Sequence, residues 1–160
     1  MARVRVRLKV RVKSEDAKDR LENIQDRTQD LGPVLRWAKS HLERAYEENF
    51  LSQGAVSARA MMAGGWAPLS PAYGAWKASH WPTPLMVRTG KLLFDVTHLE
   101  TDGAKSDTSI TFNVRSSIAQ YHQYGTSEMP ARKLVFVPRD FDRDIGKKTT
   151  SYVVNGSKIA

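Results

Sequence analysis

The chain has 160 residues and a mass of 18.0 kDa, enough for one domain around one hydrophobic core. It contains no apolar run of about 18 residues and no cysteine, so we expect no membrane-spanning helix, disulfide or cysteine-ligated metal. The net charge of +8 is uneven: residues 1–13 hold six basic and no acidic side chains, whereas residues 14–50 hold nine carboxylates against six Lys and Arg. The basic start lacks the apolar core of a secretory signal, and the composition is typical of a protein that folds in a reducing cytoplasm.

Basic and aliphatic residues alternate without interruption over residues 3–13. A period of two predicts a β-strand that packs its even-numbered aliphatic residues onto the helices. The opposite face is either a solvent-exposed surface whose like charges prevent aggregation, or a contact surface for DNA or an acidic partner. Its basic residues are Arg3, Arg5, Arg7, Lys9, Arg11 and Lys13.

Two helices are predicted next. Ser14 is a candidate N-cap, and Gly32-Pro33 ends the first helix and begins the second, which reaches to about Gly54. The first helix has a narrow apolar stripe formed by Ala17, Leu21, Ile24, Thr28 and Leu31. The second has a buried stripe formed by Val34, Leu35, Ala38, Leu42, Ala45 and Tyr46. The sequence allows either a helical hairpin or a nearly collinear pair with a kink at Pro33.

Residues 51–90 have the composition of a long loop. They contain five glycines, four prolines and three tryptophans, and residues 51–94 contain no carboxylate. We expect at most one short helix there, beginning at Ser70-Pro71. Loops of this length in a compact domain are usually functional, and so many tryptophans argue against simple disorder. The loop is therefore expected to be the main assembly element, becoming ordered in contact with neighbouring subunits; the alternative is that its tryptophans fold back onto their own core.

The remaining chain predicts short elements. After a helical turn near Leu92, strands at residues 96–101 and 109–115 form a β-hairpin, an amphipathic turn covers residues 117–124, and a strand at residues 133–138 ends at a proline. A short helix begins near Asp140, followed by a weakly specified tail at 147–160. The predicted fold is one α+β domain over residues 1–160: a mainly antiparallel sheet of about four strands packed against two main helices, with a long extended loop.

No group of residues is spaced for catalysis or ligand binding. Residues 88–91 resemble part of a phosphate-binding loop but lack its first glycine and its final Ser or Thr. Asp140, Asp142 and Asp144 begin a calcium-loop pattern in which Ile145 replaces the required glycine. The four histidines show no metal-ligand spacing: His41, His80, His98 and His122. We therefore expect no enzyme activity, no cofactor and no metal site.

Four short motifs follow one another in a recognisable order. They are G-W-A-P-L-S at 65–70, L-M-V-R-T-G-K-L at 85–92, A-Q-Y-H-Q-Y-G at 119–125 and P-A-R-K-L-V-F-V-P at 130–138. In this order they resemble the phage virion morphogenesis family, the tail-completion and neck proteins of tailed bacteriophages. The resemblance covers about residues 60–140. The chain departs from the family pattern in the placing of Ala119 before Tyr121, in a longer segment at 51–64 and in a shorter C-terminal helix.

The resemblance implies a virion structural protein that assembles in the host cytoplasm. It implies a ring, expected to be a hexamer, that joins the head connector to the tail tube, with the tail terminator and head-closure or connector proteins as partners and genome DNA in the channel. It implies no membrane and no small-molecule substrate. Two alternatives remain open: a tail terminator or head-closure protein of the same region, or a nucleic-acid-binding module, which the cationic strand would favour.

The motifs also imply roles for particular residues. Gly90 and Gly125 are expected to form turns or helix caps, and His122 to hydrogen-bond across the hairpin. The residues expected to carry the fold signature are Thr89, Gly90, Leu92, Tyr121, His122, Tyr124 and Gly125. The residues expected at the assembly interface are Trp66, Leu69, Tyr73, Trp76, Trp81 and Arg88.

Overall fold

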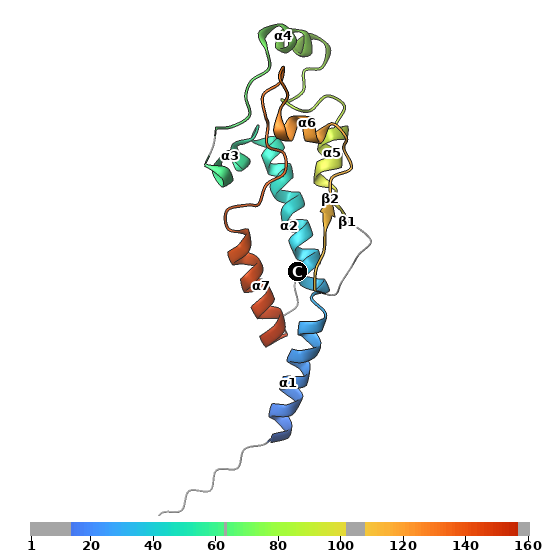
Figure 1. Ribbon diagram of the computed structural model, residues 1–160, viewed down its shortest axis with the longest axis vertical. Coiled ribbons are helices and arrows are strands. Elements are labelled where there is room, and N and C mark those ends of the chain that lie inside the picture. Colours follow the sequence, from blue (N-terminus) through green and yellow to red (C-terminus); the bar gives the residue numbers. More distant parts are fainter. Residues whose placement is uncertain (1–13, 63, 102–107, 157–160) are drawn as a thin grey trace, which may run out of the picture.

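The computed structural model describes residues 14–62, 64–101 and 108–156. The predicted basic strand at residues 3–13 lies outside the described residues. Within them the molecule is elongated and contains seven helices and one two-stranded sheet (Figure 1). The predicted four-stranded antiparallel sheet is therefore wrong, and the protein is mainly helical.

Helix α1 (Ser14–Gln29) and helix α2 (Gly32–Leu51) follow one another almost along one line (Figure 1). The break between them is short, because Leu31 is already the N-cap of α2 and Pro33 lies in its first turn. The backbone N–H of Gly32 donates to Oδ1 of Asp30 at 2.9 Å, which satisfies one amide at the break. Of the two arrangements that the sequence allowed, the collinear pair is the one observed.

Helix α2 supplies the centre of the core. Its predicted stripe is confirmed, except that Leu35 is only half-buried; the stripe also extends to Asn49 and Phe50. It packs against α5 (Lys91–Thr97) and the extended segment 134–136. It also contacts α7 (Phe141–Asn155). Tyr46 meets Phe136 edge to face, and burial raises the pKa of Tyr46 to about 12 although its hydrogen bond with the Phe136 backbone opposes the shift.

Residues 51–90 are more ordered than the composition suggested. They contain two helices, α3 (Ala55–Met61) and α4 (Pro71–His80), where at most one was predicted. The predicted start of α4 is confirmed: the Ser70 hydroxyl caps it by accepting from the N–H of Tyr73. Trp66 is buried edge to face against Phe50, with ring centroids 5.1 Å apart. This tryptophan therefore folds back onto its own core.

The predicted hairpin exists but is very short. Strands β1 (Glu100–Thr101) and β2 (Phe112–Asn113) pair antiparallel, with Glu100 opposite Asn113. The first two residues of the predicted first strand, Val96 and Thr97, belong to α5, where Leu92 and Val96 recur at helical spacing and are both buried. The amphipathic turn is a helix, α6 (Ala119–Tyr124).

Residues 133–138 do not form the predicted strand. Their backbone groups are satisfied by side chains instead of a neighbouring strand: the N–H groups of Leu134 and Val135 donate to Oε1 of Gln123, whose Nε2 donates to the Val135 carbonyl. An apolar run with these side-chain partners needs no sheet. The helix predicted near Asp140 is also longer than expected, since α7 continues to Asn155 where a weakly specified tail was predicted.

Candidate assembly interface

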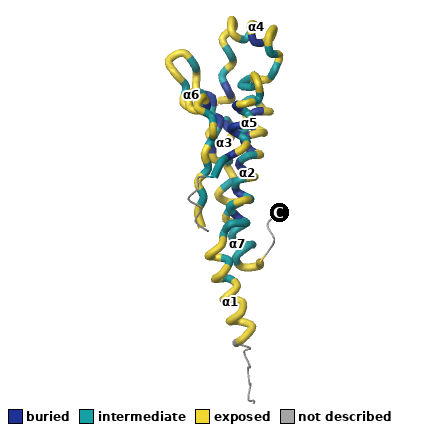
Figure 2. Tube along the Cα trace, turned by 90° about the vertical axis from the view of Figure 1, so that its right-hand side faces the viewer, coloured by how far each residue is buried: buried dark blue, intermediate teal, exposed yellow. Residues whose placement is uncertain are grey.

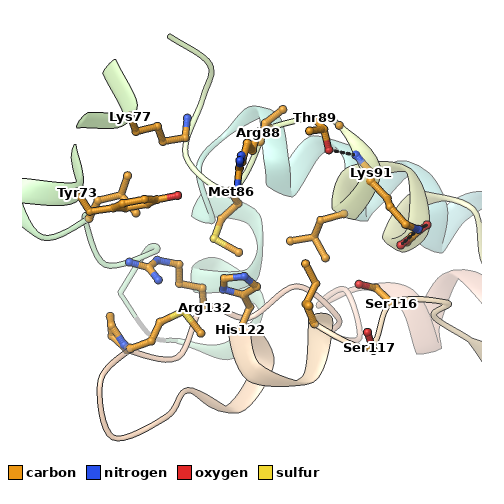
Figure 3. A pocket seen from close by; sticks show the side chains of 18 of the residues that line it. Tyr73, Lys77, Met86, Arg88, Thr89, Lys91, Ser116, Ser117, His122 and Arg132 are labelled. Atoms are coloured by element: carbon orange, nitrogen blue, oxygen red, sulfur yellow. Dashed lines mark hydrogen bonds and ion pairs between the residues drawn. The ribbon is translucent and has the colours of Figure 1, made fainter. Parts of the chain in front are cut away.

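A half-open cavity of about 800 Å³ lies between α4, α5 and the segment around α6. It sits at the end of the molecule opposite α1 (Figures 1 and 2). All four sequence motifs contribute to its walls, although they are separated by up to about 60 residues of chain (Figure 3). The motif residues around it include Leu69, Ser70, Arg88, Thr89, His122 and Arg132.

The interior of the cavity is apolar with one imidazole. Met86 and His122 point toward one another in its middle (Figure 3), and Leu92 and Ile118 complete the apolar lining. Nδ1 of His122 is buried without a hydrogen-bond partner, so this ring nitrogen does not form the predicted hydrogen bond across the hairpin. Burial lowers the pKa of His122, and the nearby charge of Arg132 lowers it further.

Arg132 ties two motifs together. Its side chain is only 3% exposed, and its guanidinium donates from Nε to the Ala67 carbonyl and from Nη2 to the Pro68 carbonyl, at 2.9 and 3.0 Å. Burial lowers the pKa of this guanidinium below its usual value. The backbone of Arg132 also donates to the His122 carbonyl at 2.6 Å. One residue thereby fixes the loop before α4 relative to α6.

Lys77, a buried residue of α4, also holds a neighbouring loop in place. It is 6% exposed, and its ammonium group donates to the carbonyls of Trp81, Thr83 and Pro84 and to the Thr83 hydroxyl. A buried ammonium needs such partners because it loses its hydration. Lys77 therefore holds the turn after α4 in place, and with it the position of Trp81.

The lining of the cavity is basic. Five Lys and Arg side chains line the cavity against two carboxylates, and two of the five, Lys77 and Arg132, are buried. Asp95 is already neutralised by Lys91, whose Nζ lies 2.8 Å from Oδ2, and Arg115 pairs with Glu100 outside the cavity. The guanidinium of Arg88 lies 4.2 Å from the centre of the Trp81 ring, and no carboxylate of the described residues pairs with it. Arg88 and Glu128 are the exposed charges of the lining that remain, and the positive excess of the lining comes from the buried Lys77 and Arg132.

An aromatic cluster covers the outside of α4, beside the cavity. Trp76 stacks on Tyr73 and on His80, with ring centroids 5.6 and 4.7 Å apart, and contacts Trp81 at 5.4 Å. Tyr73 and Trp76 remain 43% and 40% exposed. Exposed apolar surface of this kind at the tip of an elongated molecule is typical of a protein–protein contact.

The structure divides the predicted interface residues into three groups. Leu69, Tyr73 and Arg88 line the cavity, Trp76 and Trp81 form the neighbouring aromatic cluster, and Trp66 lies in the core. The predicted fold-signature residues also divide. Thr89, Gly90, Leu92 and His122 line the cavity, whereas Tyr121 and Tyr124 are exposed outside it.

The two predicted glycine caps are confirmed. Gly90 is the N-cap of α5 with φ of 82°, and Gly125 is the C-cap of α6 with φ of 77°. The sequence interpretation missed Lys77, Gln123 and Arg132 as organising residues. Gln123 and Arg132 lie inside two of the motifs, so the motifs could have indicated them. Lys77 is a single lysine in a glycine-rich segment, and nothing in the sequence marks it.

Comparison of the chain with protein-family models, curated proteins and solved structures gives no significant match. In the described part of the chain, no three His, Asp or Glu side chains are grouped so as to hold a metal ion. No helix in that part combines the length and the hydropathy needed to cross a bilayer.

Proposed function

We propose that the protein is a virion structural protein of a tailed bacteriophage, a tail-completion or neck component that forms a ring between the head connector and the tail tube. The observation that carries this proposal is the meeting of all four motifs around one cavity. The four motifs lie apart in the sequence but share one surface of the folded chain, as expected if they specify a common contact.

The shape and surface of the subunit support an assembly role. The molecule is a rod with exposed aromatic side chains at one end, including Tyr73 and Trp76, and an exposed leucine, Leu21, near the other. A stable interface buries about 800 Å² on each partner. Tyr73 and Trp76 are 43% and 40% exposed, so the cluster on α4 still has aromatic surface to bury against a neighbour and can anchor one contact.

Some side chains of this surface hold its backbone in place, and others are available to contact a neighbouring subunit. Lys77 and Arg132 are used internally, to fix the backbone that carries the aromatic cluster and the cavity walls. Arg88 and Trp81 present a cation stacked on a ring toward solvent. A preorganised surface loses little conformational entropy on association, which favours repeated and identical contacts around a ring.

The test is deletion of the gene from the phage or prophage that encodes it, followed by electron microscopy and mass spectrometry of the particles. We expect unjoined heads and tails, restored by supplying the wild-type protein. A Trp76→Ala, Trp81→Ala double variant should fold, judged by circular dichroism and thermal unfolding, yet fail to restore joining. Leu51→Ala, at a leucine that is 76% exposed and does not line the cavity, is the matched control and should restore it.

Three results would overturn the proposal: normal joined particles after deletion, absence of the protein from purified particles, or full restoration by the double variant. The position of the protein in the particle, seen by labelling it, separates the neck ring from a tail terminator or a head-closure protein.

A further inference from the structure

Within the described part of the chain, helix α1 presents an amphipathic surface that no other element covers. Every residue from Glu15 to Asn23 is exposed, and Leu21 is 66% exposed. Ala17, Leu21 and Ile24 are spaced four and three residues apart, so they lie on one face of the helix. Among the described residues, the contacts of α1 with its own subunit lie in its C-terminal part, where Arg27 donates to the Val153 carbonyl on α7. The rest projects from the molecule (Figure 1).

The charge of this projecting surface is opposite to that of the cavity. Residues 15–23 carry four carboxylates against two basic side chains. The cavity carries five Lys and Arg against two carboxylates, with Arg88 unpaired at its rim. Each surface combines an apolar centre with charged surroundings, Leu21 on the helix and Met86 with Ile118 in the cavity. Such complementarity steers association and fixes its register.

The dimensions agree as well. An α-helix with its side chains is about 10–12 Å across and rises about 5.4 Å per turn, so one turn occupies roughly 400–600 Å³. A half-open cavity of about 800 Å³ therefore accepts one to two turns of such a helix. The exposed stretch around Leu21, residues 15–23, is about two and a half turns long, so the cavity accepts most of it.

We infer that the exposed part of α1 from one subunit docks in the cavity of a second copy of the chain, between α4, α5 and α6. This inference rests on the proposed ring function and names the contact that builds the ring. The helix and the elements that line the cavity lie at opposite ends of the molecule (Figure 2). A subunit whose helix is docked in one neighbour can therefore still receive the helix of another neighbour in its own cavity. Such a heterologous contact propagates from subunit to subunit, and it closes into a ring when the rotation between neighbours allows.

The experiment uses two variants that each damage one half of the contact. Leu21→Asp places a charge on the apolar face of α1, and Ile118→Asp places one in the cavity, at a residue 50% exposed. Leu51→Asp, the same change at an exposed leucine outside both surfaces, is the control. Circular dichroism confirms folding, and light scattering after size-exclusion chromatography gives the mass of the wild type, each variant and an equimolar mixture of Leu21→Asp with Ile118→Asp.

We expect a closed oligomer for the wild type and the control, and monomers for each of the two variants alone. The mixture should give a one-to-one dimer that grows no further, since the intact helix of the Ile118→Asp chain fits the intact cavity of the Leu21→Asp chain. This dimer is the distinctive result, because a contact between identical surfaces cannot produce it.

Monomers in the mixture, a monomeric wild type, or normal assembly of either variant would overturn the inference. So would binding of a DNA oligonucleotide by the wild type that Ile118→Asp abolishes, because the cavity would then be a phosphate site. Rings that persist in both variants, while the protein is still needed to join heads and tails, would leave the proposed function standing. A one-to-one dimer from a protein absent from the particles would leave the contact standing and remove the function.

Discussion

The indole N–H of Trp66 donates a hydrogen bond of 2.9 Å to the carbonyl oxygen of Lys133. The same carbonyl accepts a second hydrogen bond, of 3.0 Å, from Nδ2 of Asn49 on α2. Oδ1 of Asn49 in turn accepts from the N–H of Ser57 on α3 at 2.8 Å. This buried network joins the first and last sequence motifs to the central helix, and it supports the loop from which the cavity wall begins.

Replacing Trp66 by phenylalanine should therefore destabilise the fold. The change removes one buried hydrogen bond and part of a ring that packs on Phe50, while the Lys133 carbonyl keeps its bond from Asn49. We expect a loss of about 2 kcal/mol in the free energy of unfolding. Trp76→Phe, at an exposed ring, should change it by less than about 0.5 kcal/mol. Urea unfolding followed by circular dichroism measures both, and equal losses would contradict the role assigned to Trp66.

Two glycines are expected to respond in opposite directions to alanine. Gly125 has φ of 77°, and a Cβ there would lie 2.8 Å from the Ala131 nitrogen and 2.9 Å from the Met129 carbonyl oxygen. Because both neighbours are backbone atoms, Gly125→Ala should cost more than about 1 kcal/mol. Gly146 lies inside α7 with nothing within 4 Å, so Gly146→Ala should stabilise the protein by about 0.5–1 kcal/mol. The two melting temperatures, compared with wild type, test this pair; a shift in the same direction would contradict it.

The features that the sequence predicted well are those that depend on local chemistry. The stripe on α2 follows from helical periodicity, and the start of α4 follows from a serine cap before a proline. Gly125 follows from the preference of a helix C-terminus for a glycine with positive φ, and Gly90 from the positive φ of the turn before α5. Each of these signals is contained within a few neighbouring residues, so no tertiary information was needed.

The failures have a common cause. A short apolar run is compatible with a strand or with a coil whose backbone is satisfied from elsewhere, and only the fold decides. At residues 133–138 the partners are Gln123, Asn49 and Trp66, which lie far away in the sequence or on another element. The cavity was likewise hidden, because it exists only where the four motifs meet. The order of the motifs indicated a shared role but gave no geometry.

Lys77→Met should loosen the tip of the molecule more than its core. The change keeps the aliphatic length of the side chain but removes the ammonium group that binds the carbonyls of Trp81, Thr83 and Pro84. Hydrogen exchange should rise in the amides of residues 77–87, while exchange in the buried half of α2 stays as in wild type. Lys91→Met, at an exposed side chain on α5, is the control and should leave residues 77–87 unchanged. Uniform loosening of the whole molecule would contradict a local role for Lys77.

His122 should make stability depend on pH below neutrality. Burial, with the charge of Arg132, holds the pKa of His122 below its unfolded value of about 6.5. Between the two pKa values the unfolded chain binds a proton that the folded chain does not, so the free energy of unfolding falls as the pH decreases from about 6.5 toward the folded pKa. The stabilisation from a neutral His122 is fully present above about pH 6.5.

In His122→Gln, which keeps a polar side chain of similar size but does not titrate, the melting temperature should fall less between about pH 7.5 and 5.5 than in wild type. His41, His80 and His98 are unchanged between the two proteins, so the comparison isolates the contribution of His122. Parallel melting curves for the two proteins across this range would contradict a buried, neutral His122.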